Sequence, residues 1–139
     1  MRVTRLQDPR LLTGRGRFAQ DWNAPDALHG CFLRSDRAHA VIRAIDVRSA
    51  RDHPGVHLVL TGEDAVNAGY VRPLNFMKGT GKDGMSPRIP DRPVLAHGKV
   101  RFVGDPVAFV VAATADVAHD AAQLIRVEYD DLPCVVEAD

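Results

Sequence analysis

Residues 101–112 read RFVGDPVAFVVA, and this stretch decides the fold. The turn Gly104-Asp105-Pro106 opens a continuous apolar run from Val107 to Ala112, which predicts a strand buried on both faces. Thr114 follows in the N-cap position, because its hydroxyl can accept a hydrogen bond from a free amide of a first helical turn. A helix is therefore expected to begin near Ala115.

The apolar residues of this helix recur at three- and four-residue spacing and form one stripe. The stripe consists of Val117, Ala118, Ala121, Leu124 and Ile125, and the water-facing side consists of Asp116, His119, Asp120 and Gln123. From Ile125 the apolar period changes to two, so that Ile125, Val127 and Tyr129 point one way. This alternation predicts a half-buried strand that ends at Pro133.

The preceding part of the chain carries further strand and turn signals. Strands are predicted at residues 28–33, 40–47, 56–60, 94–95 and 99–102. A short helix at 49–53 is ended by Pro54-Gly55, and Thr61 caps a helical turn at 62–65. This order of elements predicts a single-domain α+β fold with a mixed sheet and two or three short helices.

Length, composition and charge exclude several classes of protein. A chain of 139 residues with 45% hydrophobic residues has the length of one domain and can bury a core. Its 18 basic and 18 acidic side chains cancel, so no overall field attracts nucleic acid or an anionic membrane. No apolar run approaches the ~20 residues of a membrane span, and no signal peptide is visible. We expect a cytoplasmic protein.

Two segments without apolar periodicity are expected to contact neighbouring domains or subunits. Residues 1–18 form an arginine-rich lead-in segment with extended or turn-like backbone, and residues 19–139 form the domain, with a long loop at about 66–92. Guanidinium groups present paired donors to carboxylates. The candidate contact residues are Arg10, Arg15 and Arg17.

Two motifs resemble binding sites but lack the required spacing. Residues 79–82, Gly-Thr-Gly-Lys, suggest a phosphate-binding loop, yet Phe76 occupies the position that needs glycine. His53 and His57 have the spacing of metal ligands on one helix, but Pro54-Gly55 breaks that helix. We interpret the first as a loop and expect no metal site from the second.

The other reactive side chains also have structural explanations. Ser35, Asp36 and His39 crowd into a polar turn without the elbow that a nucleophilic serine needs. Asp130-Asp131 lies at an exposed strand end rather than in a catalytic pair. The only cysteines, Cys31 and Cys134, have apolar neighbours and are expected to be buried thiols; two thiols cannot hold an iron–sulfur cluster alone.

Several blocks in a fixed order carry a family resemblance over nearly the whole chain, from Arg5 to Val136. The blocks are Arg10–Phe18, Phe32–Ser35 with Ala38–Ala40, Pro54–Val56, Thr61–Asp64 and Val103–Ala108. Together they resemble the hammerhead domain at the start of the molybdenum-binding large subunit of the xanthine dehydrogenase, aldehyde oxidase and carbon monoxide dehydrogenase family.

The resemblance implies a parent enzyme that hydroxylates its substrate with oxygen from water, using molybdopterin-bound molybdenum, two iron–sulfur clusters and FAD. It implies as partners the remainder of the large subunit and separate iron–sulfur and flavin subunits, as in bacterial members. No residue of this sequence matches the family's catalytic, cofactor-binding or metal-binding motifs. We therefore expect an isolated chain that is inactive and structural in role. The alternative is a free-standing small binding module with the same fold.

Overall fold

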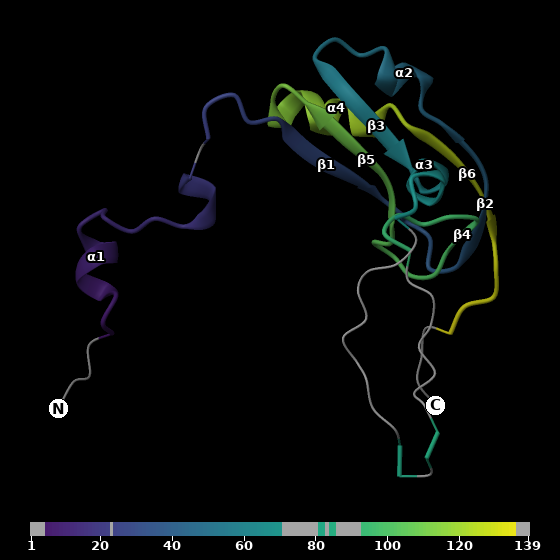
Figure 1. Ribbon diagram of the computed structural model, residues 1–139, viewed down its shortest axis with the longest axis horizontal. Coiled ribbons are helices and arrows are strands. Elements are labelled where there is room, and N and C mark those ends of the chain that lie inside the picture. Colours follow the sequence, from purple (N-terminus) through teal and green to yellow (C-terminus); the bar gives the residue numbers. More distant parts are fainter. Residues whose placement is uncertain (1–4, 23, 71–80, 83, 86–92, 136–139) are drawn as a thin grey trace.

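The computed structural model describes residues 5–22, 24–70, 81–82, 84–85 and 93–135. Figure 1 shows strands gathered into two small sheets, with α4 against one of them and α1 standing apart from both. The elements are α1 (Asp8–Leu12), a 3-10 helix (Ala19–Asp21), β1 (His29–Arg34), β2 (Ala40–Asp46), α2 (Arg48–Arg51), β3 (Val56–Thr61), α3 (Gly62–Asn67), β4 (Lys99–Val100), β5 (Pro106–Ala112), α4 (Ala115–Gln123) and β6 (Arg126–Asp131). The predicted α+β class is confirmed.

Successive strands alternate between the two sheets. The first sheet has the order β1-β5-β3 and the second the order β4-β2-β6. Every pairing among the described strands is antiparallel, so the predicted mixed sheet is wrong in this detail. The physical reason is that each connection carries the chain from one sheet to the other, and none has to link parallel neighbours.

The larger core lies between the first sheet and helices α2 and α4. The Thr114 hydroxyl accepts a hydrogen bond from the Val117 amide at 3.2 Å, and α4 begins at Ala115 as predicted. Its small side chains let the helix approach the sheet closely. The buried cluster consists of Val47, Ala50, Val59, Ala108, Val110, Ala121, Ala122 and Ile125.

Two details of this predicted unit differ in the structure. Phe109 and Val111 are only half-buried, so the prediction that β5 is buried on both faces is correct for one face alone. The reason is that α4 packs against the opposite face, on which Ala108 and Val110 lie. Leu124, predicted in the apolar stripe, is 41% exposed because it follows the last turn of α4.

The second core joins the beginning of β5 to the second sheet. Its buried members are Ala40, Ala96, Val100 and Val107. The predicted strand at 94–95 is absent, and the predicted strand at 99–102 forms only at Lys99–Val100. In their place the chain bends before Gly98, which has a φ of +72°, and the Ala96 amide donates to the Pro106 carbonyl at 2.7 Å.

Thr61 caps helix α3, as predicted, and the structure adds a capping box with Asp64; the helix continues to Asn67 instead of ending at Ala65. The predicted loop at 66–92 therefore begins after the helix, and residues 71–80, 83 and 86–92 of it lie outside the described residues. Gly62 allows α3 to lie against the next segment. A Cβ atom there would stand 2.1 Å from the Ala96 carbonyl oxygen.

The lead-in segment contains the short helix α1, so the prediction of wholly extended or turn-like backbone is wrong. Pro9 lies in its first turn, where the fixed φ of proline favours a helix start, and Asp8 adds negative charge there. α1 contains no buried residue. The helix is therefore formed by local sequence signals, without support from the core.

Candidate functional site

The three predicted contact arginines lie on the exposed lead-in segment. Arg10 is in the last turn of α1, and Arg15 and Arg17 follow it in irregular backbone; all three are exposed. The Arg17 guanidinium lies over the Trp22 ring, 5.2 Å from its centroid. Among the residues that the structure describes, none of the three forms an ion pair. The structure thus places them together on one exposed segment.

Apolar side chains accompany these arginines. Leu12 is 86% exposed, Phe18 65% and Trp22 68%. The segment holds its local shape through short-range bonds, such as that from the Phe18 amide to an Asp21 carboxylate oxygen at 2.7 Å. Exposed aromatic and arginine side chains are the types enriched at protein interfaces. The stretch between Arg10 and Trp22 therefore includes exposed arginine, aromatic and leucine side chains.

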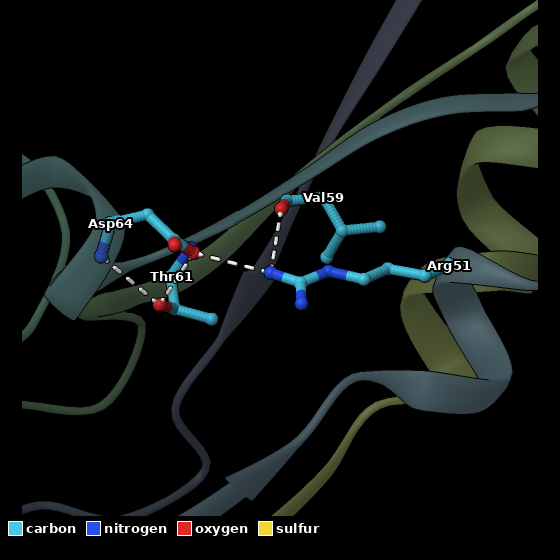
Figure 2. Close-up of polar contacts among 4 residues, drawn as sticks. All are labelled: Arg51, Val59, Thr61 and Asp64. Carbon is cyan, nitrogen blue, oxygen red and sulfur yellow. Dashed lines mark hydrogen bonds and ion pairs between the residues drawn. The ribbon is translucent and has the colours of Figure 1, made fainter. Parts of the chain in front are cut away.

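A polar cluster links α2, β3 and α3, and Figure 2 shows its contacts. An Asp64 carboxylate oxygen accepts hydrogen bonds from the Thr61 amide and the Thr61 hydroxyl, both at 2.8 Å. The Arg51 guanidinium contacts the same oxygen and the Val59 carbonyl oxygen, each at 3.5 Å. The Thr61 bonds, with a smaller contribution from the charge of Arg51, lower the pKa of Asp64.

An open hollow of 510 Å³ lies beside this cluster. The charged side chains that line it include Arg43, Arg51 and Asp64. Arg43 pairs with Asp130, and Arg51 pairs with Asp64. Exposed Glu63 also lines the hollow, but Arg43, Arg51 and Asp64 are paired within the domain, so we assign the cluster to holding α2, β3 and α3 together.

The predicted polar turn at Ser35, Asp36 and His39 is confirmed. The Ser35 hydroxyl accepts from the Arg37 amide at 2.9 Å and lies 3.1 Å from the Arg37 carbonyl oxygen, to which it donates. His39 Nδ1 lies 2.9 Å from the carbonyl oxygen of Pro133, which follows the end of β6. Ser35 and His39 thus use their polar atoms on backbone groups.

The two histidines with ligand-like spacing lie in different surroundings. His53 follows α2, with its Nδ1 atom 3.0 Å from the Pro54 carbonyl oxygen, whereas His57 is exposed on β3. Within the described ranges, no group of three or more histidine, cysteine or acidic side chains gathers at metal-binding distances.

The contact between Cys31, His119 and Gln123 is a cluster that the sequence does not predict. Cys31 Sγ of β1 lies 4.0 Å from His119 Nδ1 of α4, and His119 Nε2 lies 2.8 Å from the Gln123 amide nitrogen. The four-residue spacing of His119 and Gln123 is the only sequence signal for it. The prediction of two buried thiols is wrong: Cys31 is half-buried at the edge of its sheet, and Cys134 is exposed beyond β6.

The match to a family model covers most of this architecture. The model that describes the "aldehyde oxidase and xanthine dehydrogenase, a/b hammerhead domain" matches residues 13–133. The chain belongs to this hammerhead family. The two antiparallel sheets and few helices are therefore the hammerhead fold, and the resemblance stated from the sequence blocks is confirmed.

Known proteins place the hammerhead domain within much longer chains. The chain is 40% identical to the nicotine 6-hydroxylase large subunit of Paenarthrobacter nicotinovorans, over 98% of this chain and 16% of that protein. Quinoline 2-oxidoreductase from Pseudomonas putida 86 has 44% identity and a TM-score of 0.77, over 96% of this chain and 16% of that one. A Cu,Mo-CO dehydrogenase structure has 36% identity and a TM-score of 0.75, over 97% of this chain and 16% of that one.

The hammerhead chain thus spans about a sixth of the length of these relatives, 16% in each case. Their names describe oxidoreductases, one of them a large subunit and one a molybdenum enzyme. None of the helices in the described part of the chain has the length and apolarity that a membrane span requires.

Proposed function

We propose that this hammerhead chain is a structural domain of the molybdenum-binding large subunit of a xanthine dehydrogenase, aldehyde oxidase or carbon monoxide dehydrogenase-type oxidoreductase. The observation that carries the proposal is the family match over residues 13–133. In the relatives, the matched region is only 16% of the length of the chain. The polar clusters support it, because their charges and hydroxyls bond to the domain's own backbone and side chains.

We infer that the whole enzyme uses molybdopterin-bound molybdenum, iron–sulfur clusters and FAD, none of them held by this domain alone. The residues present do not fit an iron–sulfur cluster. The sequence has two cysteines, whereas iron–sulfur clusters usually take four thiolates. Cys31 and Cys134 also lie in different places, one in β1 and one beyond β6. We assign no catalytic step to this chain.

We propose that residues 1–18 are a lead-in segment that docks the domain, residues 19–139, onto neighbouring parts of the enzyme. The exposed Arg10, Arg15 and Arg17 and the aromatic side chains beside them support this role. Partners of matching chemistry present carboxylates and apolar surface. We expect them in the remainder of the large subunit or in the iron–sulfur and flavin subunits. A cytoplasmic location and the absence of nucleic-acid or membrane partners stay predictions.

Substitution of the three arginines by alanine in the full large subunit tests this docking. We expect weaker assembly with the partner subunits, measured by gel filtration and by cofactor content per large subunit. A matched control removes three exposed charges that form no ion pair among the described residues, with Lys99→Ala, Arg101→Ala and Arg126→Ala. Unchanged assembly and cofactor content in the first variant would refute the docking role.

The coding sequence beyond codon 139 separates the proposal from the alternative of a free-standing binding module. The proposal predicts several hundred further codons that include glycine-rich pterin-binding segments. A stop codon at that point would favour the small module.

A further inference from the structure

The face of the first sheet that points away from α4 is apolar. In antiparallel pairing, directly opposite residues share a face, so the register of β1, β5 and β3 defines its members. They lie in two cross-strand rows: Phe32, Phe109 and Leu60 in the first, and Gly30, Val111 and Leu58 in the second. We refer to these six residues as the apolar sheet face.

This face is not covered by the described part of the domain. Phe32 is 45% exposed and Leu58 is 46% exposed, and the three remaining apolar side chains are half-buried. Helix α4 contacts β1, β5 and β3 from the other side, where the buried cluster lies, and Figure 1 shows it against these strands. The face is therefore a continuous group of accessible apolar side chains on regular, paired backbone.

The side chains of the face are held in defined positions. The Phe32 and Phe109 rings lie 4.5 Å apart between centroids, in a tilted arrangement. A Cβ atom on Gly30 would stand 2.6 Å from Phe109 Cζ, so the glycine leaves room for that ring. Rigid aromatic side chains lose little conformational entropy on binding, which makes them effective anchors at interfaces.

One charged group borders the face. The Arg34 guanidinium lies 5.5 Å from the centroid of the Phe32 ring, and its Nη1 atom donates to the Gly104 carbonyl at 3.0 Å. Guanidinium has five N–H donors, so further donors remain for an acceptor outside the domain. A partner that fits this surface presents apolar side chains to the two rows and a carboxylate or carbonyl oxygen to Arg34.

We propose that the apolar sheet face is buried against the part of the same large subunit that lies outside this domain. This inference rests on the proposed function. The argument for this occupant is length: the relatives carry about five-sixths of their chains beyond the matched region, since the match covers 16%. Apolar patches of this kind on a folded domain mark interaction sites, and the attached polypeptide is present at the highest effective concentration.

Cysteine labelling tests the proposal at Leu58, because a Leu58→Cys side chain keeps the position without extending into the partner. The variant is made both in the 139-residue chain and in the molybdenum-containing large subunit. Maleimide labelling followed by peptide mass spectrometry separates this thiol from Cys31 and Cys134. We expect labelling in the large subunit to be at least tenfold slower than in the 139-residue chain.

Equal labelling rates in the two proteins would overturn the proposal. Slow labelling already in the 139-residue chain, together with a dimeric mass in solution, would also overturn it, because a second copy would then be the occupant. Both results leave the proposed function standing, since the large subunit still contains molybdenum. Failure of the proposed function would give a different result: no molybdenum would co-purify with a polypeptide that contains this domain.

Discussion

Gly62→Ala tests the close approach of α3 to the segment that precedes β4. A Cβ atom at Gly62 would lie 2.1 Å from the Ala96 carbonyl oxygen and 3.1 Å from the His97 Cα atom. Both contacts are with backbone, which cannot rotate away as a flexible side chain can. The segment can move only by straining the hydrogen bond from the Ala96 amide to the Pro106 carbonyl, 2.7 Å long.

The magnitude follows from three contributions to the free energy of unfolding. Overpacking a well-packed site costs about 1–3 kcal/mol, and loss of the Ala96 hydrogen bond adds about 1 kcal/mol. The better helix propensity of alanine returns at most about 1 kcal/mol. The net expectation is a loss of about 2 kcal/mol. For a domain of this size, that lowers the melting temperature by roughly 8 °C.

Chemical denaturation followed by far-UV circular dichroism, together with a thermal melt, measures this loss. Glu63→Ala is the matched control, because Glu63 is the next residue of α3 and is exposed. The control is expected to change the free energy of unfolding by less than about 0.5 kcal/mol. If Gly62→Ala is as stable as Glu63→Ala, the close packing of α3 against Ala96 is refuted.

Two further predictions concern the core and the polar cluster. Val110→Ala removes two fully buried methyl groups between Cys31 and Val59, so we expect the free energy of unfolding in denaturant to fall by about 2 kcal/mol. A loss no larger than that of Val111→Ala, at a half-buried position, would contradict the packing. The pKa of Asp64 is lowered in the folded state, so this carboxylate stabilises the fold above its unfolded pKa and the contribution is lost as the pH falls below about 4. Asp64→Asn should therefore reduce the fall in the free energy of unfolding at acid pH. An unchanged fall would contradict the Thr61–Asp64 hydrogen bonds.

Local patterns in the sequence predict the β5–α4–β6 region well. The apolar run, the Thr114 cap and the change of period near Ile125 each act between near neighbours in the chain. The strands and the helix that these patterns predict therefore depend little on the rest of the fold. The same holds for the capping box at Thr61, which is completed by Asp64 three residues later.

Features that depend on distant pairing are not predicted. The Cys31–His119 contact joins residues 88 apart in sequence, and it exists because α4 packs across β1. The apolar sheet face depends on which strands flank β5, and no local period reports that Phe32 and Leu60 lie on either side of Phe109. The lead-in arginines are visible in the sequence, but the exposed aromatic side chains that accompany them become evident only in the fold.

The central claim is that this hammerhead domain is structural and holds none of the enzyme's cofactors by itself. The most direct measurement is the molybdenum, iron and flavin content of the purified 139-residue chain after gel filtration, by elemental analysis and visible absorbance. The account predicts no more than traces of any of the three. Near-stoichiometric molybdenum, iron or flavin that stays with the chain through gel filtration would contradict it.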